Sequence, residues 1–563
     1  MLSTLDVSHN RMNEIQLPSD NNIRDLAIND NRFTMASLPL RGKISEERFI
    51  YAPQQDIVIA TKGPCADLTA QDVTIDGQKT VFRWIKKDGT ALVEGTDYTI
   101  TNGYTRFVNT DADSVYCAIS HAAYPAFAGD NVLKTTKMLV AGMPTNQIAS
   151  FVTANDNDTV SLSFAANADA TALYIDWEGN DNVQQYVLGT SYRVFSAVTH
   201  KDVTVRVYTY EPDEAITVFS MTGATLKSFD GSKLNDAICI RTDNAGLSSI
   251  TLPTNKETLS EVGLSGNAFT SIDFLAAYPN ITSLSASENQ LTSLDLSILP
   301  KLKVVGASNN AITTTKFNNP ALWYLDLTEN RIAEIDFTGA ANIEQMSLGH
   351  NLLKTIDVEP LSSLKALLID ANRFTFQTLP LPKSQYILYN YYNQAPLDVQ
   401  VTRDSIVDLS SQASVGDSQT TYTWYLGVPV WNSDMGMFEG EELYEDIEYT
   451  VDNGVTTFLK SFEGVMCLLT NPTFPNLYLY TDLLDVTGTT AIGYVTADGI
   501  SVSVRGRDIV LTADAACPVA LYTVGGLCIT TTTTHAGETV LTAPAAGAYI
   551  VRAGAQACKV VVP

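Results

Sequence analysis

The stretch LWYLDLTENRI, residues 322–332, contains the pattern that decides the fold. Leucines stand eight, five and three positions before Asn330, and Ile332 stands two positions after it. The leucines at minus 5 and minus 3 alternate with other residues, as in a strand with one buried face. The asparagine follows at the end of the strand, where its amide can satisfy buried backbone groups. The stretch therefore predicts a short strand that ends in an inward-facing asparagine.

The same pattern recurs at a nearly fixed spacing. Its asparagines are Asn267, Asn289, Asn310, Asn330, Asn351 and Asn372, separated by 22, 21, 20, 21 and 21 positions. Because one unit cannot bury its own apolar face, neighbouring units must stack. The pattern resembles the leucine-rich repeat, LxxLxLxxNxL, in its short form. The resemblance implies a solenoid, and a 21-residue repeat leaves room on the convex side only for turns, 3-10 segments or extended chain.

Two further units open the chain, with Asn10 and Asn31 again 21 positions apart. Two repeats are fewer than the roughly three that a stable array needs. Either residue 1 falls inside an array or another segment caps these two repeats. We expect the former, with the missing repeats and a signal peptide encoded ahead of residue 1.

A longer phrase occurs at the end of both arrays. NRFTMASLPL at 31–40 and NRFTFQTLPL at 372–381 are nearly identical. Because Pro lacks the backbone donor of a strand ladder, we interpret Leu-Pro-Leu as the end of the repeats. On this interpretation Asn31 and Asn372 close the ladder and belong to the last repeat of each array.

The segments that follow the two phrases also match, with one difference in length. Trp84 to Tyr98 spans 14 positions, and the corresponding Trp424 to Tyr449 spans 25. The second copy therefore carries an insertion of 25 − 14 = 11 residues, which we expect within VPVWNSDMGMFEGEELYED, residues 428–446.

Both of these segments contain short alternating strands broken by Gly, Asn and Asp. They resemble immunoglobulin-like sandwiches, with Trp84 and Trp424 on the third strand and Cys117 and Cys467 near the sixth. The resemblance implies an inter-sheet disulfide, for which Cys65 is the candidate partner of Cys117. The second copy has no cysteine at the matching position, so a free buried cysteine is an equal alternative.

Residues 143–225 are predicted to form another all-β unit, in which TALYIDWEGN and VQQYVL form a hairpin. The unit resembles the β cap ahead of leucine-rich repeats in bacterial surface proteins. The acidic stretch 155–158 lacks the Gly and the distal Glu of a calcium loop, so we expect a solvated turn.

The last 76 residues, 488–563, resemble the C-terminal sorting domain of Bacteroidetes-type surface proteins. The resemblance rests on VALYTVGG (519–526), GAYIVRAG (547–554) and KVVV (559–562), and it implies export or surface attachment. An ordinary terminal β-sandwich is the alternative.

We therefore expect a mainly β chain in which a short leucine-rich repeat solenoid alternates with immunoglobulin-like sandwiches. The predicted order is the end of a truncated repeat array at 1–40, an immunoglobulin-like domain at 41–142, the β cap at 143–225, the main repeat domain at 226–382, a second immunoglobulin-like domain at 383–487 and the sorting-type domain at 488–563.

Composition excludes several classes of function. Lys plus Arg is 35 and Asp plus Glu is 62, a net charge of −27, which opposes binding to nucleic acid and anionic membranes. None of the seven cysteines forms a CxxC pair, and the five histidines lie outside any known catalytic motif. No apolar run is long enough to span a membrane. We predict no enzyme, no catalytic residue, no cofactor and no metal site.

Binding is the better prediction, because a solenoid offers one broad curved face. Most outward strand positions hold small residues, whereas Tyr and Trp favour binding hot spots. The candidate ligand-binding residues are Trp323, Tyr324, Asp326, Thr328 and Gln345. Alternatively, small side chains simply let adjacent strands pack, and Trp323 covers the flank of the core.

Cap, short repeats and immunoglobulin-like domain together resemble the internalins. The resemblance implies an adhesin-like protein at the outer-membrane surface or outside the cell that engages a protein or glycan ligand on a host or neighbouring cell. A spacer of repeated modules with recognition elsewhere is the alternative, and an enzyme with an unrecognised site is a third.

Overall fold

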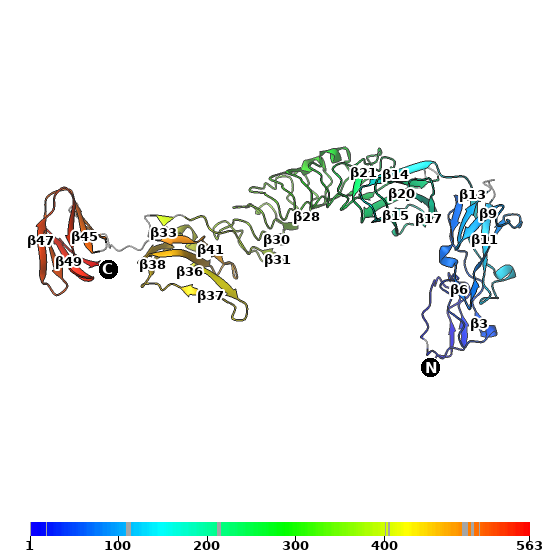
Figure 1. Ribbon diagram of the computed structural model, residues 1–563, viewed down its shortest axis with the longest axis horizontal. Coiled ribbons are helices and arrows are strands. Elements are labelled where there is room, and N and C mark those ends of the chain that lie inside the picture. The colour runs from blue at the N-terminus through cyan, green and yellow to red at the C-terminus, as the bar shows by residue number, and fades with distance from the viewer. Residues whose placement is uncertain are drawn as a thin grey trace. The chain divides into compact units, whose positions relative to one another are not determined.

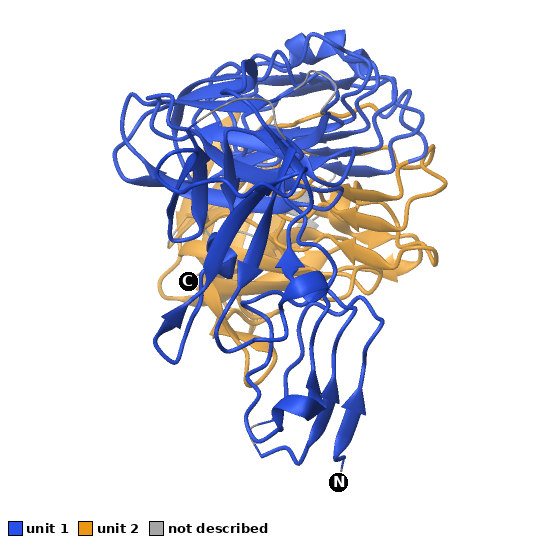
Figure 2. Cartoon of the chain, turned by 90° about the vertical axis from the view of Figure 1, so that its right-hand side faces the viewer, with its two compact units in different colours: residues 1–326, 337–342 blue, residues 327–336, 343–563 orange. Residues whose placement is uncertain are grey.

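The computed structural model describes residues 2–18, 20–108, 114–210, 215–399, 401–402, 406–486, 494–496, 500–505, 507–554 and 556–562. The chain forms two compact units, residues 1–326 with 337–342 and residues 327–336 with 343–563 (Figure 2). Strands dominate both units, which confirms the prediction of a mainly β chain. The predicted boundary at 487–488 lies outside the described residues.

The repeats of the first unit form parallel sheets of strands two or three residues long. The N-terminal sheet has the order β1 (Thr4–Asp6), β2 (Asp25–Ala27) and β3 (Phe49–Ile50). The main array of this unit contains β22 (Cys239–Arg241), β23 (Glu261–Gly263), β24 (Ser283–Ser285), β26 (Val304–Gly306) and β28 (Tyr324–Asp326), each paired in parallel with the next. This regular pairing confirms the predicted solenoid, whose successive turns are visible in Figure 1.

The repeats of the second unit contain β29 (Gln345–Ser347), β30 (Ala366–Leu368) and β31 (Leu388–Asn390), which pair with one another in parallel register. In the first unit, short 3-10 helices and strands occupy the other side of the repeats, as predicted. They are Asp273–Ala277, Leu296–Ile298, β25 (Ser293–Asp295) and β27 (Thr314–Lys316). Leucines at the predicted inward positions, such as Leu325 and Leu367, are fully buried.

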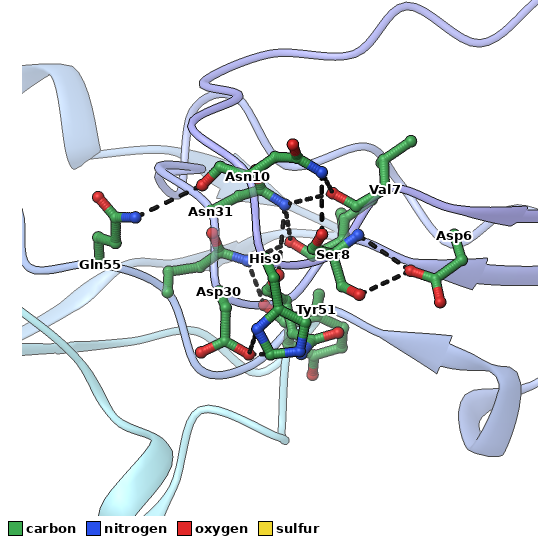
Figure 3. A network of polar contacts seen from close by, with 12 residues as sticks. Asp6, Val7, Ser8, His9, Asn10, Asp30, Asn31, Tyr51 and Gln55 are labelled. Atoms are coloured by element: carbon green, nitrogen blue, oxygen red, sulfur yellow. Dashed lines mark hydrogen bonds and ion pairs between the residues drawn. The ribbon is translucent and has the colours of Figure 1, made fainter.

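Buried repeat asparagines such as Asn31 fasten their own strand end to the neighbouring repeat, whereas the exposed Asn10 donates to Val7 and Ser8 of its own repeat. Asn31 donates through Nδ2 to the carbonyl oxygens of Val7 at 2.8 Å and Ile28 at 3.2 Å, and its Oδ1 accepts from the backbone N of Met12 at 2.9 Å (Figure 3). These bonds satisfy backbone groups that the curved chain would otherwise leave unpaired. The inward role predicted for the asparagines is thereby confirmed.

Both arrays extend one strand beyond the duplicated phrase, so the interpretation of Asn31 and Asn372 as the last asparagine-type positions is wrong. Glutamines take over the same task. Gln394 donates to the Ile369 carbonyl at 3.0 Å and accepts from the Phe374 backbone at 3.0 Å. Gln54 makes the matching bonds in the first array. Leu-Pro-Leu is therefore a return segment inside the array, since a Pro outside the parallel ladder removes none of its bonds.

Two larger sheets, which we call the first sandwich because their buried residues share one core, follow the N-terminal array, together with the small sheet of β6 (Thr74–Ile75) and β7 (Gln78–Lys79). One has the order β5 (Cys65–Asp67), β10 (Tyr104–Phe107), β9 (Tyr98–Thr101); the other has β12 (Leu133–Lys134), β11 (Ser114–Ser120), β13 (Met138–Val140), β4 (Lys62–Gly63), with β8 (Val81–Lys86) also on β11. Trp84 is fully buried and donates through Nε1 to the Thr105 hydroxyl at 3.0 Å. Cys65 and Cys117 are both free thiols, so the structure does not contain the disulfide that the resemblance implied.

The second copy, which we call the second sandwich, repeats this arrangement. Its sheets are β32 (Val401–Thr402), β33 (Ile406–Asp408), β39 (Val455–Phe458), β38 (Tyr449–Asp452), and β37 (Met437–Glu442), β36 (Thr421–Asn432), β40 (Phe462–Thr470), β41 (Leu479–Tyr480), with β42 (Leu484–Val486) on β40. Trp424 donates to the Thr456 hydroxyl at 3.1 Å, as Trp84 does to Thr105. The duplication seen in the sequence is therefore a duplication of side-chain contacts as well.

The predicted insertion forms a long hairpin. The backbone N of Leu92 donates to the Trp84 carbonyl at 2.8 Å, and Leu443 donates to the Trp424 carbonyl at 2.8 Å. The matching residues are thus 92 − 84 = 8 positions apart in the first copy and 443 − 424 = 19 in the second. The additional 11 residues lengthen β36 and β37, as the sequence predicted.

Between the first sandwich and the main array lie two further sheets. One has the order β17 (Gln184–Leu188), β16 (Thr171–Asp176), β19 (Thr204–Thr209), β14 (Asn146–Thr153), β21 (Leu226–Asp230). The other runs from β18 (Arg193–Thr199) through β15 (Asp158–Ala166) and β20 (Ile216–Thr222) directly onto β22. The hairpin of β16 and β17 confirms the predicted one. This continuity covers the first repeat, whose apolar end would otherwise face solvent.

The C-terminal segment folds into two more antiparallel sheets. They are β43 (Tyr494–Thr496), β44 (Ile500–Arg505), β45 (Asp508–Ala513), β48 (Gly537–Thr542), and β47 (Cys528–Thr533), β46 (Pro518–Thr523), β49 (Gly547–Ala553), β50 (Gln556–Val562). Alternate residues of both sheets, including Val502, Leu511, Leu521 and Val551, form one buried cluster.

Candidate functional site

The outward face of the repeat strands is the candidate site. On β28 the side chains alternate: Leu325 is fully buried, while Tyr324 and Asp326 on either side are half-buried and reach the outer face. This alternation follows from the two-residue period of a strand. The face therefore displays every second residue of each repeat strand.

Trp323 and Tyr324 form an aromatic pair at the start of β28. The rings lie 5.8 Å apart at 63°, an edge-to-face arrangement, and Trp323 is 40% exposed. Burial raises the pKa of the Tyr324 phenol, and the nearby Asp326 carboxylate raises it further. The phenol therefore stays protonated at physiological pH and can both donate and accept hydrogen bonds.

Short side chains surround this pair in the neighbouring repeats of the first unit. Ser308 donates to the Ser287 hydroxyl at 3.0 Å, and the hydroxyls of Ser265 and Ser285 lie 2.7 Å apart. Because serine side chains are short, the aromatic pair extends further from the sheet than these hydroxyl groups do. The arrangement offers flat polar contacts beside an aromatic anchor, which is a geometry for binding.

The other two candidates, Thr328 and Gln345, belong to the second compact unit. Thr328 is half-buried just after β28, and Gln345 is exposed at the start of β29. The structure thus brings Trp323, Tyr324 and Asp326 together within one unit. The assignment of all five residues to one binding site remains a prediction.

The sequence pattern missed a charged group on the same face. Arg241 contacts the Asp243 carboxylate at 3.0 Å and the Glu261 carboxylate at 2.5 Å. Burial lowers the pKa of Arg241, but the two carboxylates outweigh it and raise the pKa. The repeat that carries Arg241 was not recognised because Ala245 stands where the others have Asn. A search for the spacing alone, 267 − 245 = 22, would have found it.

The histidines among the described residues lie far apart along the chain. Among the described residues, no three His, Cys, Asp or Glu side chains are grouped as metal ligands would be. His9 and His350 each contact a single aspartate, at 3.4 Å and 3.8 Å, on the exposed surface. In the turn at 155–158, Asn155 donates to the Asp158 carboxylate at 3.3 Å. In the described part of the chain, no helix has both the length and the hydropathy of a membrane span.

Comparison with solved structures returned partial matches of low overall similarity. No family model matches the chain, and no similar curated protein was found. A TLR13–ssRNA13 complex is 22% identical over 27% of this chain and 25% of that chain, with a TM-score of 0.24. YopM from Yersinia enterocolitica is 21% identical over 30% of this chain and 41% of that chain, with a TM-score of 0.23.

An internalin-like protein of Listeria monocytogenes is 12% identical over 49% of this chain and 88% of that chain, with a TM-score of 0.29. The chain spans between about a quarter and about half of the length of the first structures that it matches. Its own repeats and their parallel strands establish that it is a leucine-rich repeat protein with a β-solenoid.

Proposed function

We propose that the chain is a non-enzymatic binding protein, adhesin-like in role, whose repeat face engages a protein or glycan ligand. One observation carries the proposal: a partly exposed Trp323–Tyr324 pair stands on a sheet face of mostly small residues. Aromatic side chains beside short polar ones are typical of interface hot spots and their surroundings.

The site in this proposal comprises Trp323, Tyr324, Asp326, Thr328 and Gln345. The net charge of −27 opposes a nucleic acid and favours an uncharged or cationic ligand surface. We place the ligand on a host or neighbouring cell, because the repeat order and the tail resemble surface proteins of bacteria.

The same proposal covers the domains and the location. The segments around Trp84 and Trp424 are proposed as immunoglobulin-like domains, supported by the equivalent Trp–Thr hydrogen bonds in both. The extra strands β3 and β31 move the proposed ends of the arrays to about Gln54 and Gln394. Residues 488–563 are proposed as a sorting-type domain, and the location as the outer-membrane surface of a Bacteroidetes-type cell or the exterior.

The test is a binding screen of the full chain against arrays of glycans and extracellular proteins, repeated with Tyr324→Ala and Trp323→Ala. We expect the affinity for the selected ligand to fall about tenfold or more in each variant. Tyr192→Ala is the matched control, because Tyr192 is 66% exposed and lies outside the repeats. Equal affinity of all three variants would refute the site, and a screen without any ligand would favour the spacer.

A further inference from the structure

The hairpin that lengthens the second sandwich exposes apolar side chains on β36, in its turn and at the start of β37. We call residues 425–442, from Tyr425 to Glu442, the arm. Its exposed apolar side chains are Val428 (65% exposed), Val430 (70%), Trp431 (45%), Met435 (65%) and Met437 (51%). A folded chain seldom leaves so many apolar side chains together in water unless they contact a partner.

Aromatic contacts hold the arm against the rest of the sandwich. The rings of Trp431, Phe438 and Tyr478 pack against each other, with centroids 5.1 Å, 5.7 Å and 4.9 Å apart. Tyr478 lies outside the arm, just before β41, so the trio fixes the hairpin to the body of the sandwich. A surface held in place in advance loses less conformational freedom when it binds.

Strand β37 is the terminal strand of its sheet, which runs β37-β36-β40-β41. A terminal strand has backbone N–H and C=O groups directed away from its neighbour, and an extended peptide can pair with them. Gly440 lets β37 pack closely on β36, because a Cβ there would lie 3.0 Å from the Tyr425 ring and 3.1 Å from the Pro429 side chain.

Charge selects the partner. Residues 428–448 contain seven acidic residues, Asp434, Glu439, Glu441, Glu442, Glu445, Asp446 and Glu448, and no Lys or Arg. Lys460, from outside the stretch, contacts Glu448 at 3.2 Å, and Asn432 donates to Glu439 at 2.7 Å. In the described part of the chain neither Glu441 nor Glu442 forms an ion pair. A second copy of the arm would be repelled, whereas a cationic segment would be attracted.

The first copy shows that the sandwich does not need the arm. There the chain turns back within seven residues, IKKDGTA at 85–91, and the Trp84–Thr105 hydrogen bond is unchanged. The extra strand length, the aromatic trio and the acidic residues are thus additions to a fold that is complete without them.

We propose that the arm is a second interaction site, at which an extended, lysine- or arginine-rich segment of a partner protein adds as a strand to the edge of β37. Alternate side chains of that segment contact the arm carboxylates, and an apolar one contacts the exposed face of Trp431. The site is independent of the repeat face and of its ligand.

The experiment measures binding of the full chain to three synthetic peptides: alternating Lys and Val, alternating Lys and Pro, and alternating Glu and Val. We expect the Lys–Val peptide to bind about tenfold more tightly than the Lys–Pro peptide, because proline cannot supply the ladder donors. The Glu–Val peptide should not bind. Equal affinity for both lysine peptides would overturn strand addition.

Two variants locate the binding. In one, residues 425–442 are replaced by IKKDGTA from the first copy; in the other, Glu439, Glu441 and Glu442 are each changed to Lys. Both should lose about tenfold or more in affinity for the Lys–Val peptide. Protection of the fully buried Cys467 from iodoacetamide verifies that each variant is folded.

The matched control changes Asp417, Asp452 and Glu463 to Lys, which alters the net charge by the same +6 at exposed positions outside the arm. Its affinity should stay within about threefold of the original. An equal loss in the control, or undiminished binding by the armless variant, would overturn the proposal. A glycan whose binding requires Trp431 but not Glu439, Glu441 and Glu442, found in a glycan array, would also overturn the proposal. A ligand of the repeat face should bind the armless variant unchanged, which separates this test from that of the proposed function.

Discussion

At the scale of single residues, the solenoid depends on polar atoms that are buried and paired. Asn351 donates to the carbonyls of Leu327, Leu348 and Gly349 at 2.9–3.2 Å and accepts from the Ile332 backbone at 2.9 Å. An alanine at this position would leave those groups in the core without partners, and an unpaired buried polar group is costly.

We therefore expect Asn351→Ala to lower the free energy of unfolding of the repeats by about 2–4 kcal/mol. Urea titration followed by hydrogen exchange of the repeat strands measures it. Asn10→Ala is the control, because Asn10 is exposed and should contribute less than about 1 kcal/mol. Similar losses in the two variants would show that burial is not the cause.

For Thr242 we expect a substitution that raises the free energy of unfolding rather than lowering it. Its side chain is fully buried at a position where the other repeats mostly have an apolar residue, and its hydroxyl has no hydrogen-bond partner among the described residues. Thr242→Val keeps the shape, removes the unpaired hydroxyl and should raise the unfolding free energy by about 1–2 kcal/mol in the same urea titration. Thr456→Val should instead be destabilising, since that hydroxyl accepts the Trp424 hydrogen bond. A Thr242→Val variant less stable than the parent would contradict this account.

At the scale of elements, the sequence predicted those parts that repeat. A fixed spacing identified six strands, and the differing Trp–Tyr distances identified the length of the arm. The asparagine pattern did not identify β22 at 239–241, nor the strands β3 and β31 that follow the duplicated phrase. Ala245, Gln54 and Gln394 replace the expected asparagine at these places. Glutamine makes the same bonds from one methylene further away, which a pattern based on Asn alone does not detect.

The strand core also predicts how stability depends on pH. Burial raises the pKa of the Cys117 thiol on β11 from 9.0 to about 12. The unfolded chain therefore releases this proton at lower pH than the folded chain, so stability falls as the pH rises from about 9 towards 12. At pH 11 this thiol should account for a loss of about 2–3 kcal/mol.

The prediction is that Cys117→Ala reduces the difference in stability between pH 8 and pH 11. Pulse proteolysis in urea, scored on peptides from β8 and β11, measures it for this sandwich. An identical pH dependence in both proteins would exclude the thiol as a contributor.

At the scale of the whole molecule, the first unit contains a joint between the first sandwich and the sheets that follow. Tyr174 donates to the Lys62 carbonyl and accepts from Gln185 at 2.8 Å. A Cβ at Gly63 would lie 1.9 Å from the Tyr174 hydroxyl, so only glycine fits. Cys65 is fully buried beneath this contact, and burial raises its thiol pKa to about 11.

Gly63→Ala should therefore open the joint and expose Cys65 to iodoacetamide at pH 8, where the parent protein protects it. Mass spectrometry of the labelled peptide measures the rate, which we expect to rise about tenfold or more. Gly142→Ala is the control, because a Cβ there meets no atom within 4 Å. Unchanged protection of Cys65 in Gly63→Ala would show that the two parts do not depend on this contact.

The candidate site was predictable only in part. The outward positions follow from the strand period, whereas the choice of Trp323 and Tyr324 as an aromatic anchor stays a prediction. The ion pairs of Arg241 were not predictable, since they depend on contacts between neighbouring strands that only the folded register brings together.

The most direct test of the central claim, that the repeat face binds the ligand, is hydrogen exchange of the full chain with and without the ligand found by the binding screen. The account predicts slower exchange in the peptides that contain β24, β26 and β28. Slower exchange confined to segments on the other side of the repeats, such as 273–277 and 296–298, with the repeat strands unchanged, would contradict it.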